Sequence, residues 1–492
     1  MNEKERLKER YITLNIPELQ RVARQALGEG EEPCPNITRL AEGGFNRVFL
    51  LKSKRGHEVI AWLPTPVAGA ALYTTASEVA TLKFLRDVLG VPVPRVLGYS
   101  ATPENGVGAE YIIMERVRDV SLAERCDSLS GEEVKSVMVQ IVKIERKIFD
   151  CPFAAYGSIY LRKDFEEIGG KNGVPLPDQQ YCIGPVAARQ YWHGKRSKTK
   201  IDRGPWTSAI ECFTSAARRD KECNIHHAKH RSRKTFLLPT THDIDPFEHT
   251  SLLASFLDLA SELIPANPPH CAPTLRHPDL SLSNIMLEPD SSKIISIIDW
   301  QGATVFPLFM QAGYPAFCEH DSTKPQSLQQ PTLPDNFDSM SAEEQNQAKA
   351  NALRMPHRGM RQYLFQQTGY PWDGDVVNLR AALIGITTPH IWSAISSNPC
   401  PINFTDDERR TAIEESNEWN ESEKLLFSIR DHLGIDLEGG TETANYEWAL
   451  KRNAELRLAC TRQAGPDENE QRVAWQNWSF KDDADTSLPP ST

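Results

Sequence analysis

The stretch of residues 275–300 constrains the fold of this chain most strongly. It contains a His-x-Asp-x4-Asn motif, whose last two polar residues are Asp279 and Asn284, followed by a short apolar run. A turn at 288–292 then leads to a second, isoleucine-rich run that ends at Asp299. Two apolar runs joined by turn residues predict a β-hairpin. This hairpin would return Asp299 to the loop that carries Asp279 and Asn284.

The three polar side chains are of the types that phosphoryl transfer requires. Such transfer needs a carboxylate that accepts or orients the attacking hydroxyl, and oxygen ligands for Mg²⁺ on the phosphates. We predict that Asp279 is the base and that Asn284 and Asp299 hold Mg²⁺. We expect His277 to pack and to hold the loop by hydrogen bonds. The alternative is a plain turn, because Asp and Asn are common turn residues.

Composition limits the classes of protein that fit this motif. The chain has 492 residues, of which 40% are hydrophobic and 25% charged, and a net charge of −11. These values are typical of a globular protein with two or three lobes. Bulk nucleic-acid binding normally needs a basic face, so we expect no nucleic-acid partner. No apolar run is long enough to span a bilayer, so we expect no transmembrane segment.

The N-terminus and the cysteines bear on localisation. Residues 1–10 mix Lys and Arg with three Glu and contain no apolar core. This composition matches neither a secretory signal nor a mitochondrial presequence. The ten cysteines are irregularly spaced and include no Cys-x-x-Cys pair. That usage indicates reduced, intracellular thiols. On these grounds we expect a cytoplasmic protein, and a monomer or weak dimer.

Local patterns predict a strand-rich region followed by a helical one. A first helix is expected at 17–27. Residues 37–117 show five strand-like runs, with one helix at 77–89 inserted after the third run. From Gly131 the periodicity becomes helical. The stretch 156–249 is rich in Gly, Pro and basic residues, and we expect it to be irregular.

Several motifs together resemble one known group of enzymes. They are His277-Pro-Asp279-Leu, Asn284-Ile, Ile298-Asp299-Trp300, Gly43-Gly44-Phe45-Asn46-Arg47-Val48-Phe49, Ala76-Ser77-Glu78-Val79-Ala80-Thr81, Gly108-Ala-Glu-Tyr-Ile-Ile-Met114-Glu115, Asp202-Arg-Gly-Pro-Trp206 and Asp299-Trp-Gln-Gly-Ala303. The chain resembles the aminoglycoside phosphotransferase and choline kinase-like superfamily. Within it, the chain is similar to a fungal branch that includes the altered-inheritance-of-mitochondria phosphotransferase-like proteins. The resemblance covers residues 35–390.

The resemblance implies an α+β, protein-kinase-like bilobal fold, with a strand-rich N-lobe and a mainly helical C-lobe. The expected divisions are a helical N-terminal extension at 1–34, the N-lobe at 35–117, the C-lobe with the catalytic loop and insertions at 118–471, and a disordered tail at 472–492. One C-lobe insertion is expected as a polar loop at 319–347. The resemblance also implies a mitochondrial location as the alternative to a cytoplasmic one.

The resemblance further implies that the cleft between the lobes binds ATP with Mg²⁺. Gly43 and Gly44 would begin the turn over the phosphates, where glycine allows close backbone approach. The other residues that would contact or support the nucleotide are Asn46, Glu78, Met114, Glu115 and Val117. For Met114, plain core packing is an equal alternative. The acceptor would be a small molecule with a hydroxyl group, and the sequence leaves its identity open.

One position departs from the kinase-like pattern. These folds place a cation on the third strand to hold the phosphates, and a helix Glu, here Glu78, orients it. The third strand of this chain has Trp62 at that position. Tryptophan has one N–H donor and no charge. It therefore cannot make a charge-assisted contact with phosphate, which contributes about 1.5–3 kcal/mol to binding. The alternative to an active enzyme is therefore a pseudokinase that binds a nucleotide or a partner without turnover.

A basic segment at 218–234 supports two weaker hypotheses. Its cationic residues are Arg218, Arg219, Lys221, Lys229, Arg231, Arg233 and Lys234. They would form a solvated loop, or a binding module for nucleic acid or lipid. The neighbouring Cys223, His226, His227 and His230 would be able to bind a transition metal, but no second half-site is evident.

Overall fold

The computed structural model describes most of the chain. The described residues are 3–30, 33–42, 44–117, 120–232, 243–311, 315–318, 340–341, 345, 375–435, 440–441, 443–465 and 467–481. Most of the expected polar loop at 319–347 and the tail at 482–492 therefore lie outside the described residues, as does Gly43.

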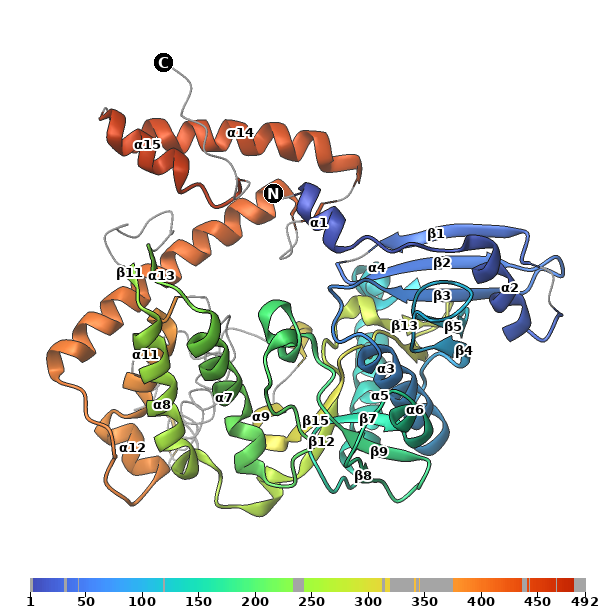
Figure 1. Cartoon of the computed structure of the whole chain (residues 1–492), viewed down its shortest axis with the longest axis horizontal. Helices are drawn as coiled ribbons and strands as arrows, with labels where there is room; N and C mark the ends of the chain where they lie inside the picture. The colour runs from blue at the N-terminus through green and yellow to red at the C-terminus, as the bar shows by residue number, and fades with distance from the viewer. Residues whose placement is uncertain are drawn as a thin grey trace.

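The N-lobe is built on one antiparallel sheet of five strands in the order β1-β2-β3-β5-β4 (Figure 1). The strands are β1 (Asn36–Glu42), β2 (Asn46–Lys52), β3 (Glu58–Pro64), β4 (Val96–Ser100) and β5 (Tyr111–Glu115). All five strand-like runs predicted from the sequence are strands. Along β3, buried and half-buried residues alternate, because successive side chains point to opposite faces of the sheet.

Each face of this sheet is covered by a different helix. Helix α2 (Ile16–Ala26) follows a short α1 (Glu3–Glu9), and Asn15 caps it by accepting the N–H of Glu18 at 3.2 Å. The α2 face buries Leu19 and Ala23 against β2, β3 and β5. On the other face lies α3 (Tyr73–Lys83), which continues into a π-helical turn, η1 (Phe84–Val88). This helix begins earlier than the predicted residue 77.

Two small sheets carry the residues of the predicted hairpin. Strands β13 (Ile285–Leu287) and β14 (Ile294–Ile297) form the hairpin, and β6 (Val120–Ser121) pairs with β13 as the third strand. Strand β12 (Pro273–Arg276), which precedes the loop, pairs with β15 (Thr304–Pro307), which follows it. The loop is therefore anchored on both sides by strand pairing. The predicted hairpin is confirmed.

The rest of the C-lobe is mainly helical. Helix α5 (Gly131–Phe149) starts at a capping box formed by Ser130 and Glu133. The other α-helices up to 395 are α4 (Leu122–Arg125), α6 (Arg162–Glu167), α7 (Ala209–His227), α8 (Pro246–Leu263), α9 (Leu308–Gln311), α11 (Val377–Ile386) and α12 (Pro389–Ile395). The remaining strands are β7 (Ser158–Leu161), β8 (Val174–Pro175), β9 (Tyr181–Gly184), β10 (Arg231–Ser232) and β11 (Asp243–Ile244). The 3-10 turns are η2 (Cys126–Ser128), η3 (Arg189–Tyr191), η4 (Gly194–Lys198), η5 (Pro268–Cys271), η6 (Leu282–Asn284), η7 (Ala316–Cys318) and η9 (Thr443–Asn445).

The prediction of an irregular stretch at 156–249 was wrong in two places. Strands β7, β9 and β8 form a three-stranded sheet, and α7 runs through the first half of the basic segment. Arg219, expected on a solvated loop, is 1% exposed and pairs with the carboxylate of Asp220 at 2.9 Å. The basic segment up to residue 227 is thus a helix with a buried side.

Of the three C-terminal helices, the first runs alongside α11, and the last two lie above the C-lobe (Figure 1). The three are α13 (Asp406–Leu433), α14 (Tyr446–Gln463) and α15 (Glu468–Gln476). Trp478 and Phe480 follow α15 and are buried against Leu426. The prediction that the disordered tail begins at 472 is therefore wrong for residues 472–481. No helix in the described parts of the chain is long and apolar enough to cross a membrane.

Candidate active site

His277 fixes the shape of the loop between β12 and β13. Its Nε2 donates to the carbonyl oxygen of Ile298 at 2.8 Å, and its Nδ1 accepts the backbone N–H of Asp279 at 3.1 Å. The ring also lies edge-on to Trp300, with the ring centroids 4.5 Å apart. Burial lowers the pKa of His277 to about 4, so the imidazole stays neutral at physiological pH. His277 thus holds the loop to the strand that carries Asp299, as expected.

Asn284 ties the loop to its own hairpin. Its side-chain Nδ2 donates to the carbonyl oxygen of Asp279 at 2.9 Å. Its backbone carbonyl oxygen accepts the N–H of Ile298 at 3.0 Å. The amide nitrogen is thereby engaged, and the amide oxygen is the atom of this side chain that is suited to ligate a cation. The carboxylate of Asp279 is exposed.

Asp299 lies just beyond the end of β14 in an unusual backbone conformation. Its φ angle is 63°, in the left-handed region that few residues other than glycine adopt. Burial raises the pKa of its carboxyl, and the negative charge of Asp279 raises it further. The structure therefore brings Asp279, Asn284 and Asp299 together, as the sequence predicted.

Gln301 connects this site to the N-lobe and was not predicted as a site residue. Its amide exchanges two hydrogen bonds with the amide of Asn46, at 3.0 and 3.2 Å. The same Nε2 donates to the carboxylate of Glu78 at 3.4 Å. Its position in the Asp-Trp-Gln-Gly motif was the only signal of a role in the sequence. Gln301 joins the start of β2, helix α3 and the segment after Asp299.

Glu78 is buried without a cationic partner among the described residues. Only 3% of it is exposed, and the Gln301 amide is its hydrogen-bond partner. Burial, and then the negative charge of Asp299, raises the pKa of Glu78 to about 8. The carboxyl is therefore largely protonated near neutral pH, which removes the need for a positive partner.

Trp62 occupies the α3 face of β3, where the kinase-like pattern places a cation. It lies opposite Val48 of β2 and Ile112 of β5, and packs against the core that α3 covers. Its indole N–H is buried and has no hydrogen-bond partner within the described residues. Trp62 therefore supplies hydrophobic contact to the lobe interior, and no charge.

The two cations of β2 that lie near β3 are directed elsewhere. Arg47 is opposite Leu63, whose side chain belongs to the core under α2, so Arg47 points to the face away from Trp62. Lys52 is at the far end of the strand pair, 3.5 Å from the carboxylate of Glu58. Neither stands in for the missing cation of the third strand.

The residues expected around the adenine lie at the end of β5. Met114 is buried in the core under α3. The backbone N–H of Glu115 donates to the carbonyl oxygen of Arg95 at 3.0 Å, and its carboxylate accepts from Arg86 at 2.9 Å. Val117 is half-buried. Contacts of these residues with a nucleotide stay predictions, as do those of Gly44.

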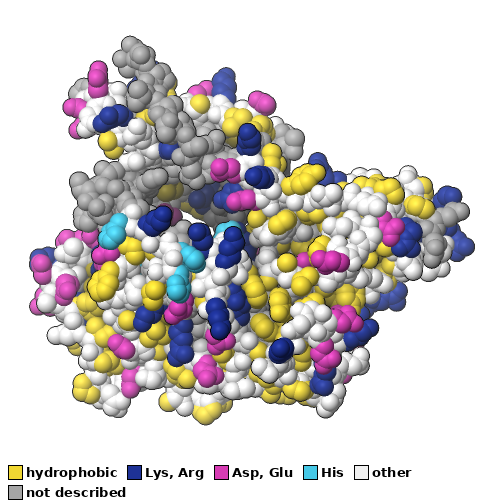
Figure 2. Space-filling view, in the orientation of Figure 1, with side chains coloured by type: hydrophobic (Ala, Val, Ile, Leu, Met, Phe, Trp, Pro, Cys, Tyr) yellow, Lys and Arg dark blue, Asp and Glu magenta, His cyan; other side chains and the backbone are white. Residues whose placement is uncertain are grey.

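The basic segment contributes to a cationic face of the C-lobe. Figure 2 shows Lys, Arg and His side chains gathered over the part of the molecule that Figure 1 draws as α7 and its neighbours.

The proposed metal cluster does not form there. Cys223 is buried, and His227 Nε2 lies 2.9 Å from the Thr199 hydroxyl. No cluster of three or more His, Cys, Asp or Glu side chains among the described residues is placed to hold a metal.

Comparison with known proteins places the chain among phosphotransferases. The model of the family described as "Phosphotransferase enzyme family" matches residues 36–313. A subtelomeric hrmA-associated cluster protein of Aspergillus fumigatus is 53% identical, over 94% of this chain and 99% of its own length. Altered inheritance of mitochondria protein 9 of Lodderomyces elongisporus is 25% identical, over 72% of this chain and 58% of its own length.

The matching solved structures are less similar in sequence. A thermostable mutant of aminoglycoside phosphotransferase APH(4)-Ia, in complex with ADP and hygromycin B, is 14% identical. It covers 77% of this chain and 98% of its own length, with a TM-score of 0.35. The family match spans more than half of the 492 residues, and the Aspergillus protein is similar from end to end. The chain is therefore a member of the phosphotransferase enzyme family, and it is similar to the fungal mitochondrial-inheritance proteins.

Proposed function

We propose that this protein transfers the γ-phosphoryl group of ATP to the hydroxyl group of a small molecule. The convergence of Asp279, Asn284 and Asp299 across one hairpin carries the proposal. Phosphoryl transfer depends mainly on positioning and on neutralising negative charge, and these residue types perform both tasks. The family match supports a phosphotransferase in general. The choice of a small-molecule acceptor and the catalytic turnover of this chain are parts of the proposal.

The residues present fit a magnesium ion. Mg²⁺ prefers a few hard oxygen ligands and completes its shell with phosphates and water. Asp299 offers a carboxylate, and the Asn284 amide is turned by its nitrogen contact with the Asp279 carbonyl. Burial raises the pKa of Asp299 and the negative charge of Asp279 raises it further, so a bound cation would favour the charged carboxylate. When bound, Mg²⁺ would neutralise charge on the β- and γ-phosphates.

The side chains of the loop would have different roles in the transfer reaction. Asp279 is exposed and would orient the acceptor hydroxyl and take up its proton. His277 is neutral and engaged at both ring nitrogens, so it would position the loop without exchanging protons. Asn284 would keep Asp279 and the end of β14 at a fixed separation through its contacts with both.

Nucleotide binding tests this proposal directly. Isothermal titration with ATP, with and without Mg²⁺, should show binding that the metal strengthens. Asp299→Asn should lose the metal-dependent part of the affinity and keep the rest. An exposed carboxylate on the hairpin turn, Asp290, provides the matched control Asp290→Asn. If the parent protein bound no nucleotide under either condition, the proposed function would be wrong.

The location of the protein is also a proposal. Several relatives that are 25–26% identical carry the name altered inheritance of mitochondria protein 9, mitochondrial. Their names support a mitochondrial location, with the cytoplasm as the alternative. Fluorescence microscopy of the full-length chain with a C-terminal tag would separate the two.

A nucleotide-binding pseudokinase is the second candidate. The observations that favour it are the contact of Glu78 with the neutral amide of Gln301 and the presence of Trp62 on β3 where a cation would be expected. Trp62→Lys would place an ammonium group on the α3 face of β3, within the reach of Glu78. An ATPase and transfer assay on both proteins separates the candidates. Turnover only in Trp62→Lys would identify the parent as a pseudokinase.

A further inference from the structure

We propose that Arg189, from the C-lobe, supplies the positive charge on the nucleotide phosphates that β3 does not supply. This inference rests on the proposed nucleotide site. It assigns to one residue the task of neutralising phosphate charge in a chain that has Trp62 at the usual place for a cation.

Arg189 reaches across to the N-lobe from the first position of η3. Its guanidinium carbon lies 4.8 Å from the centroid of the Phe45 ring, and its Nε donates to the carbonyl oxygen of Val67 at 2.9 Å. Phe45 directly follows Gly44 in the predicted turn over the phosphates. The Phe45 carbonyl oxygen is in turn held by the backbone N–H of Thr65, at 2.7 Å. The guanidinium therefore stands against Phe45 and the segment that leaves β3.

The segment that carries Arg189, residues 187–189, also borders the strand end that carries Asp299. A Cβ built on Gly302 would lie 3.7 Å from the Cα of Ala188. The backbone N–H of Ala187 donates to the Ser158 hydroxyl at 3.0 Å, and that hydroxyl donates to the carbonyl oxygen of Ala303 at 3.3 Å. Arg189 thus projects from a segment that lies against Gly302, three residues after the expected metal ligand, and its guanidinium reaches Phe45, which follows the predicted phosphate turn.

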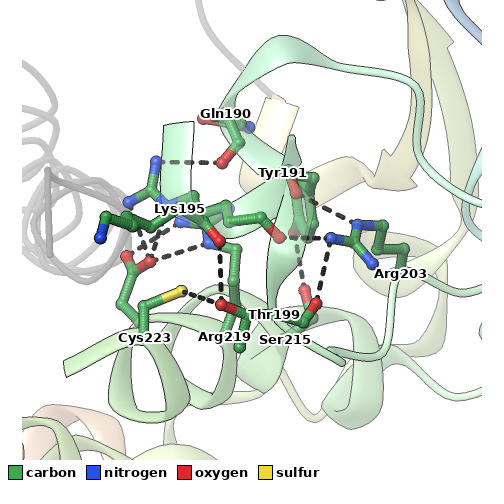
Figure 3. Close-up of polar contacts among 10 residues, drawn as sticks. Gln190, Tyr191, Lys195, Thr199, Arg203, Ser215, Arg219 and Cys223 are labelled. Carbon is green, nitrogen blue, oxygen red and sulfur yellow. Dashed lines mark hydrogen bonds and ion pairs between the residues drawn. The ribbon is translucent and has the colours of Figure 1, made fainter. Parts of the chain in front are cut away.

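A buried ionic network holds η3 in place (Figure 3). Arg196 donates to the carbonyl oxygen of Gln190 at 3.0 Å, and Arg203 donates to that of Tyr191 at 3.1 Å. Arg196 is itself fixed by Asp220 of α7, at 2.8 Å. Gln190 is therefore tied to α7 through its backbone carbonyl, and Tyr191 through its hydroxyl, which lies 2.7 Å from that of Ser215. A side chain that is presented by an anchored segment keeps a defined position, which favours specific recognition of an anion.

Charge and geometry make arginine suitable for this task. A guanidinium has five N–H donors in a planar fork that matches phosphate oxygens, and it remains charged at all physiological pH values. Its contact with the carbonyl of Val67 already orients the fork. A phosphate bound by Arg189 would connect the C-lobe to the glycine turn, so phosphate binding and closure of the two lobes would be coupled.

Comparison of ATP with adenosine tests this assignment, because adenosine has no phosphate. Arg189→Gln keeps a donor for the Val67 carbonyl and removes the charge. We expect it to weaken ATP binding in the presence of Mg²⁺ roughly 10- to 100-fold, as for the loss of a charge-assisted contact. The affinity for adenosine should change less than about twofold. Arg189→Lys should recover part of the affinity for ATP.

The controls separate failure of this inference from failure of the proposed function. Lys198 is an exposed cation of η4, and Lys198→Ala should bind ATP as the parent does. Circular dichroism and thermal unfolding establish that each variant is folded. If the parent bound ATP and Arg189→Gln bound it equally well, the inference alone would be overturned. If the parent bound neither ligand, the nucleotide site itself would be refuted. Recovery of ATP affinity in a Trp62→Lys, Arg189→Gln double variant would support the inference further.

Discussion

The side-chain amide of Gln301 donates to the buried carboxylate of Glu78 at 3.4 Å, so that an amide occupies the place of a cation in this site. The two residues are 223 positions apart in sequence. Their contact joins helix α3 to the segment that follows Asp299. Burial, and then the negative charge of Asp299, raises the pKa of Glu78, and no described cation stabilises its charged form.

The first prediction concerns the pH dependence of stability. The folded-state pKa of Glu78, about 8, lies above its ordinary value of 4.5, so the folded protein binds more protons between these pH values. The Glu78 contribution to stability is therefore intact below pH 4.5 and decreases as the pH rises towards 8. Glu78→Gln removes the titration, and should stabilise the protein at pH 8 by roughly 2–4 kcal/mol relative to the parent.

Chemical unfolding between pH 5 and pH 8.5 measures this effect. The difference between Glu78→Gln and the parent should grow as the pH rises. The exposed Glu418 of α13 gives the control Glu418→Gln, whose difference from the parent should stay constant. A constant difference for Glu78→Gln would show that the carboxyl titrates near its ordinary pKa.

The second prediction concerns the base. Asp279→Asn keeps the size of the side chain and removes its ability to take up a proton. Transfer to the acceptor should fall roughly 100- to 10,000-fold, while ATP affinity should stay within about twofold of that of the parent. Single-turnover transfer and isothermal titration on the same preparation measure both quantities. An unchanged rate of transfer in Asp279→Asn would exclude Asp279 as the base.

The hairpin was predictable from sequence because its determinants are local. Two apolar runs, a turn and the loop residues lie within positions 275–300, and the two runs pair as predicted, with Ile285 opposite Ile297 in the structure. The Gln301 bridge was not predictable in the same way. Its partner Asn46 is 255 positions away, and an amide at either position has no periodic or spacing signal. Such contacts depend on how the lobes are placed relative to each other.

Helix α7 was missed for a different reason. The charged residues around Arg219 suggested a solvated loop, because charged side chains are rarely fully buried. Their burial is possible because Asp220 accepts hydrogen bonds from both Arg196 and Arg219. A signal was nevertheless present. Cys212, Ala216 and Cys223 recur at helical spacing and are all buried. The apolar periodicity was therefore a better predictor of this helix than the charge content.

The third prediction follows from that shared carboxylate. Asp220→Asn removes the negative charge that the buried guanidinium groups of Arg196 and Arg219 contact. The loss should lower the free energy of unfolding by about 3–5 kcal/mol. The neighbouring Glu222 is exposed, and Glu222→Gln should change it by less than about 0.5 kcal/mol. Equilibrium unfolding in urea measures both variants. Equal stabilities for the two would show that the ionic network contributes little.

The fourth prediction concerns the C-terminal helices. Trp478 is 2% exposed, and its indole N–H donates to the side chain of Asn453 at 2.8 Å. Trp478→Ala would open a cavity against Leu426 and should cost about 3–5 kcal/mol in the stability of these helices. Trp448 on α14 is 50% exposed, and Trp448→Ala should cost less than about 1 kcal/mol. Hydrogen exchange of α13–α15 measures the effect. Equal protection in both variants would contradict the burial of Trp478.

Because Asp299 has a left-handed backbone, substitutions at this position can separate the effect of the side-chain charge from the effect of the side-chain shape. At a φ of 63°, β-branched side chains are strained, whereas Asp, Asn and Gly are tolerated. A library randomised at position 299 and selected only for folding should therefore return Asn and Gly alongside Asp. The same library selected for metal-dependent activity should return Asp alone. The backbone would thus limit the substitutions by which this chain could lose the proposed metal site and still keep its fold.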